Sequence, residues 1–216
     1  MNKIKTIVVV VFNQNLFKVQ VKRVSMAYFP AFLKFDDKSI LIVGGGYVAL
    51  EKLEHLLNFS SNITLIARDF SDKVKALIDE NSLTYFKKDY QIGDAKGFDI
   101  VIAAIDDFSL QESIYFETRD YNNTLCNCVD LQKYCDFIFP AYIKKGDLTV
   151  AISTSGSSPA FAKNFKEYLK NLIPSSVEDF LKEVKALRTT MPKGRERMEF
   201  LDKKAKDYIK SWSKDS

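Results

Sequence analysis

A glycine-rich run, Gly44-Gly45-Gly46-Tyr47-Val48-Ala49, has the residue types and spacing best suited to binding chemistry. It matches the pattern G-x-G-x-x-A/G. In that pattern the first glycine permits a tight turn, the second lets the backbone approach a pyrophosphate, and the small last residue brings helix and strand together. The run follows an aliphatic segment and opens a helix-like one, so a helix N-terminus would hold the phosphates. The pattern predicts a dinucleotide site. The alternative is a glycine-rich turn that binds nothing.

A charged pair, Arg68-Asp69, follows the next aliphatic segment, about 20 residues further on, where dinucleotide-binding domains place the residue that reads the ribose. Asp69 is suited to accept a hydrogen bond from a ribose hydroxyl. Arg68 is suited to pair with a 2′-phosphate or to lie against adenine. The pair favours NAD without excluding NADP. Alternatively, Asp69 only caps the next helix.

Two further acids, Asp106 and Asp107, follow the very apolar segment Phe98–Ala104. Because the carboxyl ends of parallel strands face the ligand crevice, we expect Ala104 and Asp106 to lie beside the cofactor. The alternative is that one of the two acids caps the helix that begins near Ser109.

These residues need a sheet to position them, and the hydrophobic pattern predicts one. The expected strands are Ser39–Val43, Ile63–Ala67, Leu83–Phe86, Phe98–Ala104 and Thr124–Val129, and the expected helices are Tyr47–Phe59, Asp69–Asp79 and Leu110–Asp120. Strands that alternate with helices indicate parallel pairing. We therefore predict an α/β fold with a Rossmann-like, doubly wound parallel sheet.

The pattern changes near residue 137. Phe137–Ile143 and Leu148–Ser153 are typical of a hairpin, and a Ser/Gly turn then opens a helix over Ala160–Leu172. Ser175-x-x-Glu178 fits a capping box before two amphipathic helices. We expect an N-terminal extension (1–25), a nucleotide-binding domain (26–135), a β dimerisation segment (136–160) and a helical domain (161–216).

Charge and cysteine content exclude several classes of function. Residues 1–25 carry five basic residues and no acid, while the rest of the chain has 27 basic and 28 acidic residues, which argues against nucleic-acid binding. The longest apolar runs have six residues, far short of the roughly 20 that a membrane span needs. Cys126, Cys128 and Cys135 fit neither a disulfide framework nor a zinc spacing, so we interpret them as core residues in a reducing, cytoplasmic compartment. Met26 has the features of a natural start, which makes the first 25 residues an expected upstream extension.

Six motifs in order carry a resemblance to a known family. They are Phe29-Pro30-Ala31-Phe32, Leu41–Ala49 with Glu51-Lys52, Ile102–Asp107, Cys126-Asn127-Cys128-Val129-Asp130, Phe137–Ala141 and Ser155–Ala160. Over residues 26–216 the chain resembles the precorrin-2 dehydrogenase family, which comprises the N-terminal module of siroheme synthase and its stand-alone relatives. Ile105 and Cys128 depart from the usual Thr and Val, but neither change removes a charge.

The resemblance implies oxidation of precorrin-2 to sirohydrochlorin with NAD, in some members Fe(II) insertion to give siroheme, and a homodimer. It places the family's key acid on Asp130. A carboxylate at a strand end is also suited to take the proton that a reduced tetrapyrrole sheds after losing hydride. The implied cofactor contacts are Gly44, Gly46, Tyr47, Val48, Ala49, Arg68, Asp69, Ala104 and Asp106, the implied substrate contacts are Asn127, Ser155, Gly156 and Ser157, and no metal ligands are implied.

Two other functions occur on the same fold. A non-catalytic NAD-sensing module would need the glycine loop but no specific acid, and the motifs around Asp130 and Ser155 argue against it. A short-chain reductase would need a Tyr-x-x-x-Lys pair, and none of the ten tyrosines has a lysine four residues on.

Overall fold

Five short strands form a parallel sheet in the computed structural model, which describes residues 28–121 and 123–212. The strands are β1 (Ile40–Val43), β2 (Ile63–Ala67), β3 (Thr84–Lys87), β4 (Ile100–Ala103) and β5 (Leu125–Cys128), in the order β3-β2-β1-β4-β5. Every neighbouring pair is parallel. The predicted Rossmann-like α/β fold is therefore confirmed. The expected extension over 1–25 and the expected start at Met26 lie outside the described residues.

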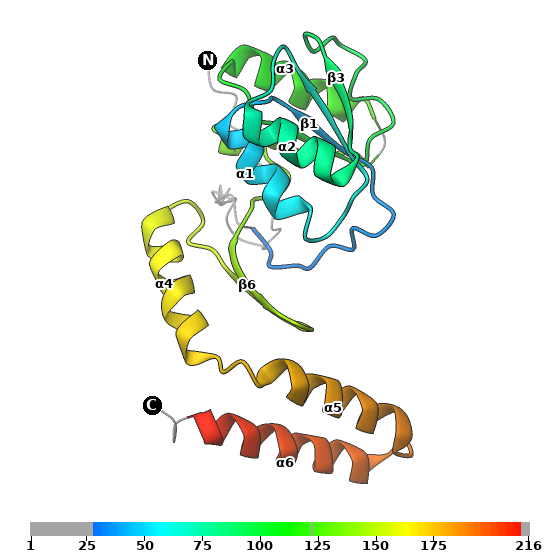
Figure 1. Ribbon diagram of the computed structural model, residues 1–216, viewed down its shortest axis with the longest axis vertical. Coiled ribbons are helices and arrows are strands. Elements are labelled where there is room, and N and C mark those ends of the chain that lie inside the picture. Colours follow the sequence, from blue (N-terminus) through cyan, green and yellow to red (C-terminus); the bar gives the residue numbers. More distant parts are fainter. Residues whose placement is uncertain (1–27, 122, 213–216) are drawn as a thin grey trace, which may run out of the picture. The chain divides into compact units, whose positions relative to one another are not determined.

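Three helices cover this sheet: α1 (Tyr47–Leu56), α2 (Asp72–Asn81) and α3 (Phe108–Arg119). Right-handed crossovers run in opposite directions from β1 and β4, so α1 and α2 lie on one face and α3 on the other (Figure 1). The α3 face is filled by buried side chains from alternate strand positions, namely Leu41, Val43, Ile66, Val101, Ala103, Cys126 and Cys128, around Ile114. The prediction that cysteines serve as core residues is confirmed for Cys126 and Cys128.

Capping side chains explain where the helices differ from the predicted bounds. Helix α2 begins at Asp72 rather than Asp69, because Ser71 is its N-cap and accepts a hydrogen bond from the Val74 N–H (3.4 Å). The interpretation of Asp69 as the cap of this helix is therefore wrong. Asp107 caps α3, accepting from the Leu110 N–H (3.0 Å), as the alternative reading of the acidic pair allowed.

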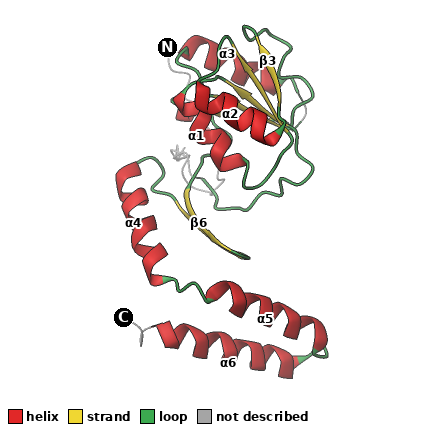
Figure 2. Cartoon of the chain, viewed as in Figure 1, coloured by secondary structure: helices red, strands yellow, loops and turns green. Residues whose placement is uncertain are grey.

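The chain divides into two compact units, residues 28–138 and the part from Phe139 onward. The second unit contains an antiparallel hairpin, β6 (Ala141–Lys145) and β7 (Leu148–Ile152), followed only by helices (Figure 2). These are α4 (Pro159–Leu172), α5 (Val177–Thr190) and α6 (Arg195–Ser211). Strand β6 begins four residues later than predicted, just after Pro140, which has no N–H to offer a strand partner.

A small apolar cluster holds the second unit together. Ile143, Ile173 and Val177 are buried against side chains that include Leu181, Tyr208 and Trp212. The predicted capping box is wrong: Ser176, not Ser175, is the N-cap of α5. No side chain caps α5, and the Ser176 hydroxyl instead lies 2.8 Å from the Tyr208 hydroxyl of α6. Among the described residues, no helix combines the length and apolar character that crossing a membrane requires.

Candidate functional site

Four of the strand ends meet at one edge of the sheet. Because all five strands are parallel, the residues after β1, β2, β4 and β5 lie along the same carboxyl edge. The connection that follows β1 runs toward β2 and the connection that follows β4 runs toward β5, in opposite directions along the sheet. The carboxyl ends of β1 and β4 therefore mark the topological switch point. Ligands of open α/β sheets bind at such a point. The candidate cofactor residues and Asp130 all follow these strands.

The glycine loop is shaped by its neighbours on both sides. Gly44 has a φ of +130°, and a Cβ built there would lie 2.1 Å from the Ala104 carbonyl oxygen. A Cβ on Gly45 would lie 2.1 Å from the Asp69 carbonyl oxygen, whereas a Cβ on Gly46 would meet nothing within 4 Å. The loop is thus packed against the ends of β2 and β4 and open at Gly46. The sequence pattern did not predict that position 45 requires glycine, although the three consecutive glycines indicated it.

The N-terminus of α1 offers free N–H groups to an anion. Gly46 is its N-cap, no side chain caps it, and its first turn holds no acidic residue. Side chains do cap α2 and α3 at this sheet. Behind the loop Ala49 is fully buried against the sheet, while Tyr47 is 78% exposed. An open glycine and an uncapped helix start fit a dinucleotide pyrophosphate.

The end of β2 presents two charged side chains, each paired with β3 or the residues after it. Asp69 Oδ1 accepts a hydrogen bond from the Phe70 N–H (3.0 Å), and Lys87 Nζ lies 3.1 Å from the same oxygen. These contacts lower the pKa of the Asp69 carboxyl. Arg68 pairs with Asp89, which raises the pKa of its guanidinium. Both contacts of Asp69 use Oδ1, so its charged carboxylate still has Oδ2 to offer a ribose hydroxyl.

The end of β4 supplies a backbone wall and one acid. The Ala104 N–H donates to the Val43 carbonyl (2.8 Å), and the Ala104 carbonyl faces Gly44. Gln111 holds the turn from α3, donating through Nε2 to the Ile105 carbonyl (2.6 Å). Asp106 is exposed, and its carboxylate has no hydrogen bond or ion pair with the described residues.

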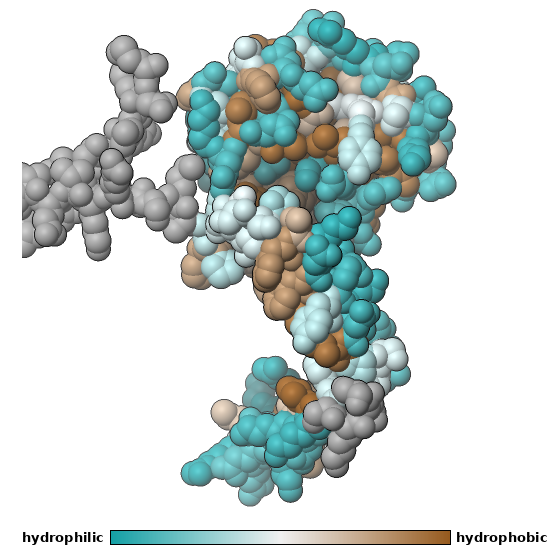
Figure 3. Space-filling model, turned by 90° about the vertical axis from the view of Figure 1, so that its left-hand side faces the viewer, coloured by the Kyte–Doolittle hydropathy of each residue, from teal (hydrophilic) through white to brown (hydrophobic). Residues whose placement is uncertain are grey.

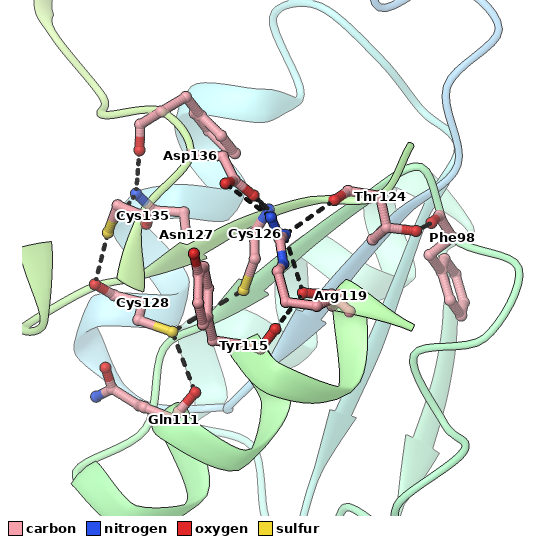
Figure 4. A network of polar contacts seen from close by, with 12 residues as sticks. Phe98, Gln111, Tyr115, Arg119, Thr124, Cys126, Asn127, Cys128, Cys135 and Asp136 are labelled. Carbon is pink, nitrogen blue, oxygen red and sulfur yellow. Dashed lines mark hydrogen bonds and ion pairs between the residues drawn. The ribbon is translucent and has the colours of Figure 1, made fainter. Parts of the chain in front are cut away.

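Beyond β5, Asp130 is an exposed residue of a turn. Its neighbour Asn127, expected to contact substrate, is 5% exposed and points into the protein, where its Nδ2 donates to the Phe137 carbonyl (2.8 Å). A polar network that sequence reasoning missed surrounds it (Figure 4): Arg119 forms an ion pair with Asp136 (2.6 Å). No sequence signal joins these two residues, which come from α3 and the segment after β5.

The remaining substrate candidates belong to the second unit. Ser155 (φ 52°) and Gly156 (φ 85°) form the turn before α4. The Ser157 N–H donates to the Thr154 carbonyl (3.0 Å), and Ser158 caps α4 through the Phe161 N–H (3.1 Å). The structure thus brings the cofactor candidates and Asp130 to one edge of the sheet and places Ser155, Gly156 and Ser157 in a separate unit.

The three thiols lie close together without forming a metal site. The sulfurs of Cys126 and Cys128 are 3.9 Å apart, and the Cys135 thiol donates to the Cys128 carbonyl (3.0 Å). Burial raises the pKa of Cys135 to about 11, and the Cys126 thiol and burial raise that of Cys128. Within the described part of the chain, no group of three His, Cys, Asp or Glu residues is arranged to hold a metal.

Comparison with known proteins agrees with this geometry. A family model described as "Putative NAD(P)-binding" matches residues 31–141, and one described as "Sirohaem biosynthesis protein central" matches residues 145–172. The siroheme synthase of Pseudoalteromonas translucida (strain TAC 125) is 38% identical over 152 residues, or 70% of this chain and 32% of that protein. That of Methylococcus capsulatus is 37% identical over 69% of this chain and 31% of that protein. The chain therefore spans about a third of the length of these relatives.

A solved structure described as "SirC, precorrin-2 dehydrogenase" shares the fold. Its TM-score is 0.68 at 24% identity, over 84% of this chain and 91% of that one. The two family models cover consecutive parts of the chain, in the order that the sequence motifs indicated. Because the first model matches more than half of this chain, the chain belongs to the NAD(P)-binding family which that model describes, and the segment after that domain is similar to the central part of sirohaem biosynthesis proteins.

Proposed function

We propose that the chain oxidises precorrin-2 to sirohydrochlorin with NAD, as a step of siroheme synthesis. The observation that carries the proposal is that an open glycine loop and an exposed carboxylate, Asp130, follow strands that end at the same edge of one parallel sheet. Siroheme synthases are similar to this chain over about 70% of its length, and a protein called precorrin-2 dehydrogenase shares its fold.

The chain's own residues would bind the cofactor and take up a proton. The loop from Gly44 to Ala49 would hold the pyrophosphate with backbone N–H groups, with Tyr47, Val48 and the residues after β4, Ala104 and Asp106, lining the site. Bound NAD supplies a hydride acceptor. The substrate loses one hydride and one proton, and the Asp130 carboxylate would accept that proton and release it to water.

The cofactor would be NAD rather than NADP. Asp69 holds a negative charge where a 2′-phosphate would lie, and its free Oδ2 is suited to a ribose hydroxyl. Arg68, the residue that would favour NADP, is already paired with Asp89.

The substrate's carboxylates would bind the turn that opens α4. Ser155 and Ser157 offer hydroxyl groups and Gly156 offers its N–H just before a helix N-terminus, which favours anions. Lys145 does not serve this purpose, because its Nζ donates to the Lys170 carbonyl (3.2 Å) at the other end of α4.

A homodimer would cover the apolar side of α4. Phe161, Phe165, Tyr168 and Leu172 follow a helical spacing and are all exposed, and Figure 3 shows hydrophobic residues along one side of this helix. Apolar patches of this kind mark association surfaces. Light scattering after gel filtration would show a dimer, and Phe165→Glu would release monomers.

The test of the proposed function is an absorbance assay with enzymatically made precorrin-2 and NAD. We expect sirohydrochlorin and NADH in equal amounts. Asp130→Ala should lower kcat by about a hundredfold or more and leave the Kd for NAD unchanged. Asp79→Ala, an exposed acid on α2, is the matched control and should match the wild type.

Other outcomes of this assay are equally informative. Binding of NAD without turnover would overturn the dehydrogenase and favour the NAD-sensing module. Addition of Fe(II) after the oxidation tests the proposed second activity, since faster siroheme formation than in the blank would show that the chain also inserts iron.

A further inference from the structure

The segment after β5 is not a free loop, because it folds back along the strand. The Asp136 N–H donates to the Cys126 carbonyl (2.8 Å), and the Cys126 N–H donates to Asp136 Oδ2 (2.8 Å). An antiparallel bridge joins Asn127 and Cys135. Residues 128–135 therefore form a closed loop whose two ends are bonded to each other, and Asp130 lies within it.

Two side chains clamp the ends of this loop (Figure 4). Arg119 of α3 binds Asp136 with both terminal nitrogens, at 3.0 and 2.6 Å, and donates to the Thr124 carbonyl (3.1 Å). Its guanidinium lies over the Tyr115 ring, 4.5 Å from the centroid. Bidentate pairs of this kind fix geometry as well as charge. The second clamp is the buried Asn127, which donates to the Phe137 carbonyl.

The Asp130 side chain is exposed. Its carboxylate has no hydrogen bond or ion pair with any residue that the structure describes. Its backbone is held instead on either side: the Val129 N–H donates to the Ala103 carbonyl (3.2 Å), and the Leu131 N–H donates to the Cys128 carbonyl (3.1 Å). The position of the carboxylate therefore depends on the closed loop.

We infer that Asn127, Arg119 and Asp136 are positioning residues for Asp130, an inference that rests on the proposed role of Asp130 as the proton acceptor. They would act by keeping the loop closed, so that the carboxylate stays at the carboxyl edge of β5. Asn127 would then contribute to the reaction through the loop and not through contact with substrate.

The test is a double-mutant cycle in the full chain, with precorrin-2 and NAD. Asp136→Asn keeps the shape of the side chain and removes the charge that binds Arg119. We expect it to lower kcat about tenfold to a hundredfold, with the Kd for NAD unchanged, because small misplacements of a reacting group have effects of this size. Made in the Asp130→Ala background, the same change should leave the residual rate unaltered.

A merely structural role would give a different result. Asp136→Asn would then lower the rate by the same factor in both backgrounds, and that outcome overturns the inference, as does an unchanged kcat in the single variant. Arg119→Lys, which keeps the charge, should lose less than Arg119→Met, and it provides a second route should Asp136→Asn not fold. The control is Asp99→Asn, which removes an ion pair at the opposite edge of the sheet and should leave kcat unchanged.

The proposed function fails in a distinguishable way. If Asp130→Ala turns over like the wild type, then the assigned proton acceptor is wrong and the positioning role falls with it. If Asp130→Ala is impaired and the cycle is additive, only the positioning role falls.

Discussion

A Cβ atom on Gly44 would lie 2.1 Å from the carbonyl oxygen of Ala104, the residue that directly follows the neighbouring strand β4. This contact ties the glycine loop to the strand across the switch point, and the φ of +130° at Gly44 adds a second reason for glycine there. Gly46, two residues on, has neither constraint. The two glycines of the same loop therefore differ: Gly44 is required by the fold, whereas Gly46 is the one that the proposed function places beside the cofactor.

Alanine variants separate these two roles. Gly44→Ala should lower the free energy of unfolding by about 1–3 kcal/mol through backbone strain and the clash with Ala104. Gly46→Ala should change it by less than about 1 kcal/mol, yet weaken NAD binding, because its Cβ would point into the open space that the pyrophosphate needs. Urea unfolding and a fluorescence titration with NADH measure the two effects. A Gly46→Ala variant that binds NADH like the wild type would contradict the placement of the pyrophosphate.

The pairing of Asp69 with Lys87 predicts how cofactor preference can be changed. Asp69→Ala should weaken NAD binding and lower the ratio of NAD to NADP affinity, because the ribose loses an acceptor and a 2′-phosphate loses a repulsive charge. Lys87→Ala should have the opposite effect on that ratio, since Asp69 would keep its charge without the nearby cation. Calorimetric titration with both cofactors measures the ratio. Equal ratios in all three proteins would exclude β2 as the ribose-reading strand.

The Asp99 carboxylate fixes the start of β4 to the start of β1 and makes stability dependent on acid. Lys38 (2.8 Å) and the Ser39 N–H (2.9 Å) lower its pKa to about 2. An aspartate in the unfolded chain has a pKa of about 3.9. Because the pKa of Asp99 is lower in the folded state, its contribution to the free energy of unfolding is fully present above about pH 4 and is lost as the pH falls toward 2. Urea midpoints of the wild type and Asp99→Asn should therefore differ at pH 7 and converge as the pH falls to about 2, and a constant difference would disprove the assignment.

Sequence alone predicted the elements around the site well, because aliphatic strands are bounded by Gly, Ser and Asp at their ends. The strand β2 was predicted at its observed bounds, Ile63–Ala67. Predictions from local sequence patterns were wrong where a side chain interacts with a residue distant in the sequence. The Ser175 capping box is not formed, and Ser176 meets Tyr208, 32 residues away. The Arg119–Asp136 pair and the inward turn of Asn127 have no periodicity and could be found only in three dimensions.

Thiol reactivity tests the packing around β5. Burial raises the pKa of Cys135 to about 11, and Cys126 is fully buried. Since the thiolate is the reactive form, Cys135 should react with Ellman's reagent at pH 8 about a hundredfold more slowly than a free cysteine. All three thiols should react at once in 6–8 M urea, roughly the range that unfolds small domains. Rapid reaction of any of the three thiols in the native protein would contradict this packing.

Glu117 joins α3 to the chain between β3 and β4. The side chain is 7% exposed and accepts hydrogen bonds from the hydroxyls of Tyr90 (2.7 Å) and Tyr121 (2.8 Å) and from the Gly93 N–H (2.8 Å). The hydrogen bond that the Tyr121 hydroxyl donates to this carboxylate raises the pKa of Tyr121 to about 12. Glu117→Ala leaves three donors without their acceptor, so it should lower the free energy of unfolding by about 2–4 kcal/mol.

Glu117→Gln provides the sharper measurement, because it keeps the size of the side chain and removes its charge. The pKa of Tyr121 should then fall toward the ordinary value of about 10, because its hydroxyl no longer donates to a carboxylate. A pH titration of the absorbance at roughly 295 nm, where the ionised tyrosine ring absorbs, would measure this change. The exposed Glu80 of α2 serves as control, since Glu80→Gln should alter neither stability nor the tyrosine titration. An unchanged titration in Glu117→Gln would mean that Tyr121 does not donate to this carboxylate, and the link between α3 and the β3–β4 connection would then rest on Tyr90 and Gly93 alone.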